Sequence, residues 1–334
     1  SAGSLPGPVC YQRGGTRPTV TDAFVVCGMI GHGDLGYNAV KVDVEASRRA
    51  IGELAGKLGV SVEDAAETII QIAISLMYAD VSGLVSRFGI DPREFHFLAF
   101  GGAGPMMACF LARELNMKGV VVPPTPGVLS ALGGLVADLK NDFIRMLYRV
   151  LSPELTVELL DAAETLSREA RAWLDREHGA GLPHRLSFSG DMRYQGQSFE
   201  IEVPLESEWV RQGDLTAIRA AFDAQHERVF GHADRRAPVQ MINLRLVIAS
   251  PTAKPRLLPI AAGTGSPAPR GEVSCHLDGS DMKVPLYRRE DFLAGQAIPG
   301  PAIIAQDDTT TCVPPGMRVD VDSFGNLVIT PASN

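Results

Sequence analysis

Apolar residues recur about every 3.6 positions in two early stretches of the chain, which predicts two amphipathic helices. The first covers residues 43–58 and the second covers residues 61–88. Ser61 lies three residues before Asp64, an arrangement close to a capping box that predicts where the second helix begins. Gly89 and the Asp-Pro pair just beyond it predict where that helix ends.

Two short apolar runs follow, with a helical pattern between them. Residues 97–100 and 119–122 are typical of buried strands, and the segment from Met106 to Leu115 has apolar side chains at helical spacing. Helices that alternate with short apolar strands indicate an α/β fold with a largely parallel sheet. We therefore expect residues 97–100 to form a central strand of that sheet.

The pattern changes after about residue 148. Residues 155–177 are charged and amphipathic, which predicts a helix that connects two domains and packs on the first. From residue 186 onward apolar and polar positions alternate with period two, for example in 199–203 and 242–248, as in β strands. The expected organisation is a first domain at 1–148, a connector helix at 149–182 and a β-rich domain at 183–334.

Composition narrows the classes of partner and compartment. The 334-residue chain has a net charge of −8, and no lysine or arginine run exceeds a pair, so we expect neither nucleic acid nor an anionic membrane as a partner. The five cysteines are scattered and never form CxxC, which favours reduced thiols in a cytoplasmic protein. The apolar stretch 95–111 is interrupted by glycines and a proline, so it predicts core rather than a membrane span.

A glycine-rich turn is the strongest candidate for a binding site. The apolar run 97–100 leads into Gly101-Gly102-Ala103-Gly104-Pro105, and a helical pattern follows directly. Glycines at such a turn let the backbone approach a ligand, and the helix start offers unpaired N–H groups. The spacing is neither GxGxxG nor a P-loop. A tight turn that only packs against a neighbouring helix is the alternative.

Asp22 and Cys10 are candidates for chemistry near the start of the chain. Asp22 follows Pro-Thr-Val-Thr, and its carboxylate could face an active site. The alternative is that Thr21 or Asp22 caps a helix through Phe24 and Val25. Cys10 could be a nucleophile, but no histidine lies near it in sequence, so a buried apolar role is the default.

Two further groups could hold a metal, and for both a structural role is the stronger prediction. His226 and His232 fit no common zinc spacing. Asp307 and Asp308 lie beside three threonines without a histidine or a third carboxylate near them, which favours solvent exposure or hydrogen bonding to threonine. We expect no metal ligand in either group.

Most of the chain resembles the second half of the hydantoinase A/5-oxoprolinase proteins, a family that includes the related subunits of acetone and acetophenone carboxylases. The resemblance extends from residue 8 to residue 329, and five blocks carry it. They are Gly-Pro-Val-Cys-Tyr-Gln-Arg-Gly-Gly at 7–15 with Pro-Thr-Val-Thr-Asp-Ala at 18–23, Gly-Gly-Ala-Gly-Pro at 101–105, Val-Val-Pro-Pro-Thr-Pro-Gly-Val-Leu-Ser-Ala-Leu-Gly at 121–133, Asp-Met-Arg-Tyr-Gln-Gly-Gln-Ser at 191–198, and Gly-Pro-Ala-Ile-Ile at 300–304.

The resemblance implies a fold, a cofactor and partners. It implies the second half of an actin-like ATPase domain, related to sugar kinases, followed by a β-rich α+β carboxy-terminal domain. In that family the glycine turn touches the adenosine of ATP, which assigns cofactor binding to residues 101–105, and the block containing Asp22 lies close to the catalytic cleft. Two Asp-Gly-rich loops that hold the phosphates and Mg²⁺ precede the Gly-Pro-x-Cys-Tyr block in family members. Because this chain lacks them, we expect it to need the missing amino-terminal half, and a hydantoinase B-type partner subunit, for ATP hydrolysis.

Three departures from the family pattern leave the function open. Met107 stands at a position that is usually histidine, Ile74 and Leu76 replace two asparagines, and Ala305 replaces a glutamate. One hypothesis is an ATP-dependent enzyme that phosphorylates a small substrate, either opening a cyclic amide or carboxylating a ketone. The other is a non-catalytic scaffold whose nucleotide site has decayed.

Overall fold

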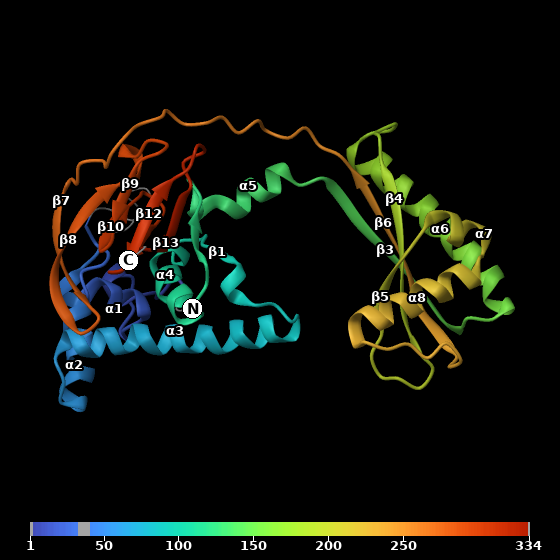
Figure 1. The fold of residues 1–334 in the computed structure, drawn as a ribbon, viewed down its shortest axis with the longest axis horizontal. Helices are drawn as coiled ribbons and strands as arrows, with labels where there is room; N and C mark the ends of the chain where they lie inside the picture. The colour runs from blue at the N-terminus through green and yellow to red at the C-terminus, as the bar shows by residue number, and fades with distance from the viewer. Residues whose placement is uncertain (1–2, 33–40, 333–334) are drawn as a thin grey trace. The chain divides into compact units, whose positions relative to one another are not determined.

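The computed structural model describes residues 3–32 and 41–332, which form two compact units (Figure 1). The first unit contains residues 1–134 and 256–334, and the second contains residues 135–255. The second unit is therefore inserted into the sequence of the first. This differs from the boundaries expected at 149 and 183, because strands near the end of the chain return to pair with strands of the first 134 residues.

The first unit contains the helices that the periodicity predicts. The structure confirms a helix at each of the two early stretches, with Asp43 capping one by accepting a hydrogen bond from Ala46 N–H and Ser61 capping the other by accepting from Asp64 N–H. Gly59 ends the first of them in the left-handed conformation that glycine tolerates. The helices are α1 (Val20–Val26), α2 (Val44–Leu58), α3 (Val62–Arg87), α4 (Gly104–Glu114) and α5 (Leu129–Val136), with 3-10 turns η1 (Val9–Tyr11), η2 (Pro92–Glu94), η3 (Pro126–Val128) and η4 (Arg289–Asp291).

A five-stranded mixed sheet is the first of two sheets in this unit. Its order is β1 (His96–Leu98), β2 (Gly119–Val122), β13 (Leu327–Pro331), β12 (Met317–Val321) and β9 (Ala297–Pro299). Only β1 and β2 are parallel, and β1 lies at the edge. The expectation of a largely parallel sheet with this strand at its centre was wrong, because β13 occupies the other side of β2 and runs antiparallel to it.

The second sheet of this unit has the order β11 (Thr310–Val313), β10 (Ala302–Ala305), β8 (Ser280–Arg288) and β7 (Gly271–Leu277). The predicted Pro-Pro-Gly turn at 314–316 does lie between two strands, β11 and β12, but these belong to different sheets. The side chains of Ile303, Ile304, Val319 and Val321 are buried as predicted. They contribute to the core of the first unit and not to a separate carboxy-terminal domain.

The second unit is a four-stranded antiparallel sheet covered by helices. Helix α6 (Pro153–His178) packs on β3 and β6, and its apolar stripe, including Leu159 and Leu166, is buried with Phe222 of α8. It is therefore a core helix of this unit and not a connector on the first domain. The strand order is β3 (Leu139–Val150), β6 (Val239–Ser250), β4 (Arg185–Tyr194) and β5 (Ile201–Leu205), and the other helices are α7 (Ser207–Gln212) and α8 (Leu215–Phe230).

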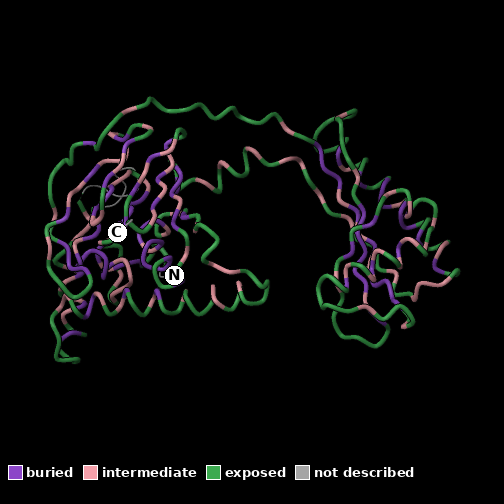
Figure 2. Tube along the Cα trace, viewed as in Figure 1, coloured by how far each residue is buried: buried purple, intermediate pink, exposed green. Residues whose placement is uncertain are grey.

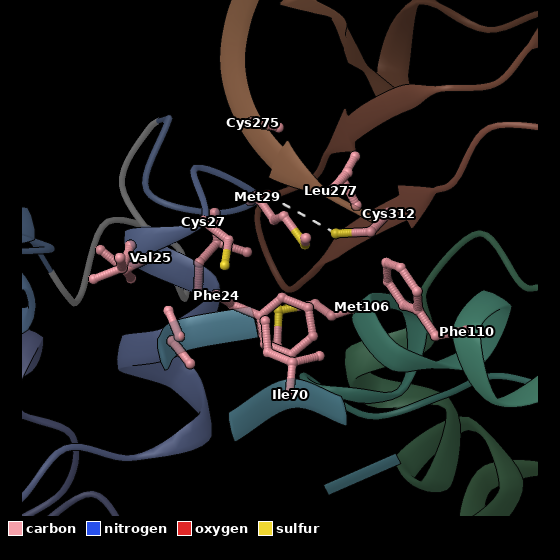
Figure 3. Packing of buried hydrophobic residues seen from close by; sticks show 14 of the residues in the cluster. Phe24, Val25, Cys27, Met29, Ile70, Met106, Phe110, Cys275, Leu277 and Cys312 are labelled. Atoms are coloured by element: carbon pink, nitrogen blue, oxygen red, sulfur yellow. Dashed lines mark hydrogen bonds between the residues drawn. The ribbon is translucent and has the colours of Figure 1, made fainter. Parts of the chain in front are cut away.

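The core of the first unit joins its amino-terminal helices to its later strands. Phe24 of α1, Ile70 of α3 and Met106 of α4 belong to one buried cluster with Cys312 of β11 (Figure 3). Phe24 and the two valines after it are buried in this core. Figure 2 shows a different distribution on α3, whose outer side is largely exposed. Helix α3 therefore exposes apolar side chains, such as Ile72 and Leu76, whereas α1 does not.

Candidate functional site

The glycine turn connects an edge strand to a helix. The ladder between β1 and β2 continues to Ala99, whose N–H donates to the carbonyl of Val121 at 2.9 Å. The backbone then turns at Gly101, whose φ of +81° is one that residues with a Cβ rarely adopt. Helix α4 begins at Gly104 without a side-chain cap, which leaves the N–H groups of its first turn, apart from Pro105 that has none, without a capping acceptor.

Three segments far apart in sequence meet at this turn. The N–H of Gly101 donates to the carbonyl of Pro126 in η3 at 2.8 Å. From the loop between β10 and β11, Thr309 Oγ1 donates to the carbonyl of Gly102 at 2.7 Å. The carboxylate of Asp308, in the same loop, accepts from the N–H of Gly127 at 2.8 Å. The loop thus fixes both the glycine turn and η3, a structural role of the kind predicted for it, although the partners are Gly127 and Gly102 and not the neighbouring threonines.

The space next to the backbone is open at Gly101 and Gly102 but filled at Gly127 in η3. A Cβ added at Gly101 would meet no atom within 4 Å, and one at Gly102 would meet only the carbonyl oxygen of Asp308 at 3.9 Å. In contrast, a Cβ at Gly127 would lie 2.7 Å from the Asp308 carboxylate. Phe100 borders the turn with 49% of its surface exposed, which supplies an aromatic face beside the open space. The arrangement suits a ligand with a flat apolar part, held against backbone.

Arg289 and Asp308 are two charged residues that each have a buried side-chain atom without a hydrogen-bond partner among the described residues. Arg289 Nη2 donates to the carbonyl of Val122 at 3.1 Å, while its Nη1 is buried and has no hydrogen-bond partner. Oδ1 of Asp308 is also buried and unpartnered. Burial lowers the pKa of Arg289 to about 10, and the negative charges of Asp308 and Asp322 oppose that shift. The guanidinium remains charged at neutral pH and balances the Asp308 carboxylate.

Asp22 is completely buried and holds the start of the chain against α1. Its carboxylate accepts hydrogen bonds from the N–H groups of Val9, Cys10 and Thr19 and from the hydroxyls of Thr19 and Ser47, at 2.7–3.1 Å. Burial raises its pKa, but these hydrogen bonds outweigh burial and the net pKa is lowered. Thr19 and Asp22 form a capping box at the start of α1. A capped helix was therefore predicted correctly, but the cap residue is Thr19 and not Thr21 or Asp22.

The other sequence candidates lie in structural environments. His226 packs against Tyr194 and Phe222, and its Nδ1 contacts the carbonyl of His232 at 2.7 Å. The thiol of Cys10 is buried, and burial, with the charge of Asp22, raises its pKa to about 12, so it is a poor nucleophile. Within residues 3–32 and 41–332, no group of three or more His, Cys, Asp and Glu side chains could hold a metal ion.

Two family models together match most of the chain. Residues 1–143 match the family described as hydantoinase/oxoprolinase, and residues 156–329 match the hydantoinase/oxoprolinase C-terminal domain. The chain belongs to the hydantoinase/oxoprolinase family. The caprolactamase subunit alpha of Pseudomonas jessenii is 32% identical over 99% of this chain and 49% of its own length.

Other relatives are named for different reactions. The 5-oxoprolinase 1 of Arabidopsis thaliana is 30% identical over 98% of this chain and 27% of its own length. The acetophenone carboxylase gamma subunit of Aromatoleum aromaticum is 30% identical over 98% of this chain and 47% of its own length. This chain therefore spans about half, or less, of the length of these relatives.

Solved structures share the fold. The ATP-dependent caprolactamase from Pseudomonas jessenii superposes with a TM-score of 0.80 and 30% identity, covering 100% of this chain and 49% of that one. A nucleotide-free acetone carboxylase structure gives a TM-score of 0.78 at 24% identity, covering 97% of this chain and 48% of that one.

Proposed function

We propose that this chain is the carboxy-terminal portion or subunit of an ATP-dependent amidohydrolase that opens a cyclic amide. The observation that carries the proposal is the open space above Gly101 and Gly102, bordered by the uncapped start of α4 and by Phe100. Residues 101–105 would hold the adenosine side of the nucleotide by backbone contact. Relatives described as ATP-dependent caprolactamase and 5-oxoprolinase support this reaction class.

Bound ATP would supply its terminal phosphoryl group to the amide oxygen. Water would then add to the amide carbon, the ring C–N bond would break with a proton passing to the amine nitrogen, and a second water would release phosphate from the resulting acyl phosphate to leave a carboxylate. The residues of this chain would orient the nucleotide and exclude water from one side of it. The remaining half of the enzyme would hold the phosphate and Mg²⁺ sites. A hydantoinase B-type subunit would be a further partner, and the enzyme would act in the cytoplasm. Asp22 would act by fixing α1, because its carboxylate is buried and already accepts five hydrogen bonds.

Two alternatives have their own support. An ATP-dependent ketone carboxylase is favoured by the likeness to the acetophenone carboxylase subunit. A scaffold with a decayed nucleotide site is favoured by Met107, which packs on the apolar core where the family has histidine, and by Ile74, which is buried where the family has asparagine. Both alternatives keep the fold and change only the chemistry.

Nucleotide binding tests the proposal. The chain would be co-expressed with the complementary half, defined as the part of the Pseudomonas jessenii caprolactamase alpha subunit that this chain does not match. We expect the complex to bind ATP and Gly102→Val to abolish binding, because the branched side chain would fill the open space without meeting protein atoms closer than 3.9 Å at Cβ. Gly133→Val, at an exposed position of α5 with equally open space, is the matched control and should leave binding unchanged.

Three other results would change the proposed function or its site. Equal ATP affinity for wild type and Gly102→Val would overturn the assignment of residues 101–105. A folded complex that binds no nucleotide would support the scaffold alternative. If ATP is consumed only when a ketone and bicarbonate are added, and not with lactams, the carboxylase alternative replaces the amidohydrolase.

A further inference from the structure

A hollow of about 350 Å³ lies between helices α6 and α7 of the second unit. The two helices pack against each other (Figure 1). The α6 residues that line the hollow stand at positions 160, 163, 164, 167 and 171, which is the spacing of one helix face. Because every lining residue belongs to residues 135–255, the hollow is formed within one unit. Its lining consists of Leu160, Ala163, Glu164, Ser167 and Arg171 of α6 and Arg211 of α7.

The two arginines of the α6–α7 hollow have no acidic partner. Within residues 3–32 and 41–332, neither Arg171 nor Arg211 forms an ion pair or a side-chain hydrogen bond. Elsewhere on α6 such a partner is present, since Asp161 pairs with Arg145 of β3 at 3.3 Å. An unpaired guanidinium keeps all its N–H donors in a planar fork that matches the two oxygens of a carboxylate. Two such groups in one hollow favour an anionic ligand.

Ser167 adds a hydroxyl to the same hollow. Only 9% of its surface is exposed, and its hydroxyl has no hydrogen-bond partner in the described part of the chain. Its neighbours on the buried stripe of α6, including Ala163 and Ala170, are apolar. A nearly buried hydroxyl without a partner is unfavourable, and serine is also a weaker helix former than the residues around it. A ligand that hydrogen-bonds to this hydroxyl explains why a polar residue stands there.

The rest of the lining indicates the rest of the ligand. Glu164 has no ion-pair partner among the described residues, because Arg168, one helical turn later, donates instead to Thr165 Oγ1 at 3.4 Å. The free carboxylate of Glu164 suits an ammonium group. It lies seven residues before Arg171, which is roughly 10 Å along the helix axis. Leu160 and Ala163 supply apolar surface beside these charges.

We propose that the α6–α7 hollow binds a short aliphatic amino acid whose carboxylate and ammonium groups are separated by several carbons. Arg171, Arg211 and Ser167 donate to the carboxylate, Glu164 accepts from the ammonium group, and the apolar lining contacts the carbon chain. The identity of the ligand rests on the proposed function, because opening of a cyclic amide leaves one chain with a carboxylate at one end and an ammonium group at the other. The hollow is thus a product site that shares no residue with the glycine turn.

Inorganic phosphate is the other product of the proposed reaction, and guanidinium groups bind it equally well. Two features of the hollow favour the amino acid. Phosphate makes no use of the apolar surface of Leu160 and Ala163, and the carboxylate of Glu164 repels it. Both features suit a zwitterion with an aliphatic chain.

Isothermal titration calorimetry of the chain with 6-aminohexanoate, hexanoate, hexylamine and inorganic phosphate tests this inference. We expect 6-aminohexanoate to bind most tightly. Arg171→Gln and Arg211→Gln should each weaken its binding about tenfold or more, because each loses a charged hydrogen bond. Glu164→Gln should weaken the binding of 6-aminohexanoate and not that of hexanoate, whereas Ser167→Ala should weaken both.

The control variant is Arg168→Gln, which removes an exposed arginine of α6 that does not line the hollow and should bind as the wild type does. Arg171 and Arg211 are exposed and make no side-chain hydrogen bond to the described residues, so their variants should fold normally. The fluorescence of Trp173 on α6 and Trp209 on α7 reports whether the second unit is intact in each variant.

The opposing outcomes are distinct. Wild-type affinity in Arg171→Gln and Arg211→Gln, or no binding of any of the four compounds at millimolar concentration, would overturn the site. Tighter binding of inorganic phosphate than of 6-aminohexanoate, lost in Arg171→Gln, would replace the amino acid by phosphate. Equal affinity for hexanoate and 6-aminohexanoate, unchanged in Glu164→Gln, would overturn the role of Glu164.

The same measurements separate this inference from the proposed function, because the calorimetry contains no nucleotide. Binding of 6-aminohexanoate in the expected pattern, together with a folded complex that binds no ATP, would count against the proposed function alone. ATP binding by the complex without any binding of 6-aminohexanoate would count against the α6–α7 hollow alone.

Discussion

The carboxylate of Asp308 accepts a 2.8 Å hydrogen bond from the backbone N–H of Gly127, a residue 181 positions earlier in the chain. No side chain other than hydrogen fits at residue 127, because a Cβ there would lie 2.7 Å from the Asp308 Cβ and Oδ2. The glycine and the aspartate therefore depend on one another. Together with the bond from Thr309 to Gly102, this contact fixes the geometry of the glycine turn.

A double-mutant cycle between these two residues should show strong coupling. Gly127→Ala alone should destabilise the fold by forcing the Asp308 carboxylate away, and Asp308→Gly alone should lose a charged hydrogen bond, a cost of about 1.5–3 kcal/mol. The double variant should be more stable, by about 1 kcal/mol or more, than the sum of the two single effects predicts, because the clash between the new Cβ and the Asp308 carboxylate is absent. Urea unfolding of the four proteins measures this.

The control pairs Asp308→Gly with Gly133→Ala, where an added Cβ meets nothing within 4 Å. Those two changes should be additive. Additivity in the Gly127 cycle as well would contradict the contact.

Asp22 should make stability depend on pH at the acid end. Its folded pKa is lowered, so the stability that it contributes is complete above the unfolded value of about 3.9 and is lost as pH falls through the folded pKa. Asp22→Asn should destabilise the protein by about 2 kcal/mol near pH 7, since it loses charged hydrogen bonds. The difference between variant and wild type should shrink below about pH 4. Denaturant titrations at several pH values, with the exposed Glu53→Gln of α2 as a control, decide the matter.

His276 should produce a pH dependence of the opposite sign. Burial lowers its pKa, but a 2.8 Å contact with Asp281 and the charges of Glu67 and Asp64 outweigh burial, so the net pKa is raised. The contribution to stability is complete below about pH 6.5 and is lost as pH rises through the folded pKa. We expect His276→Gln to reduce the loss of stability between pH 6 and pH 8 measured by urea unfolding. An equal change of unfolding free energy with pH in wild type and His276→Gln would contradict this. His32→Gln is the control variant.

The two units should be separately observable because of where their probe residues lie. Both tryptophans, Trp173 and Trp209, are in the second unit, and all five cysteines are in the first. Phe222→Ala should cost about 3–5 kcal/mol in the second unit, since its side chain is fully buried there. The urea midpoint from tryptophan fluorescence should fall, while the midpoint from thiol labelling should stay the same. A parallel fall in both midpoints would show that the units unfold as one.

Local features of this fold could be predicted from the sequence. The caps at Asp43, Ser61 and Thr19 depend on residues three positions apart, so the pattern contains the necessary information. The order of strand, glycine turn and helix was predicted for the same reason, and the structure confirms it at residues 96–114.

Pairings across the chain could not be predicted in this way. Val122 pairs with Leu327, and nothing in either strand specifies the other, since both are short apolar runs. Because of this pairing, the last strands of the chain belong to the first unit, and β2 has a partner on each side while β1 lies at the edge of the sheet. The hydrogen bond between Asp308 and Gly127 was not predicted, because this partner is defined only by the folded chain, and the only sequence signal was the glycine itself, in a Thr-Pro-Gly turn.

The insertion of the second unit into the first has a consequence for synthesis. Residues 135–255 form a complete unit, so this part can fold on the ribosome as soon as it has emerged. The first unit cannot fold completely at that stage, because β2 pairs with β13 and the glycine turn is hydrogen-bonded by Thr309, and both come later in the sequence. The residues of the first unit that precede the second unit in sequence thus reach their final structure only after it, and until then β2 and the glycine turn lack these partners.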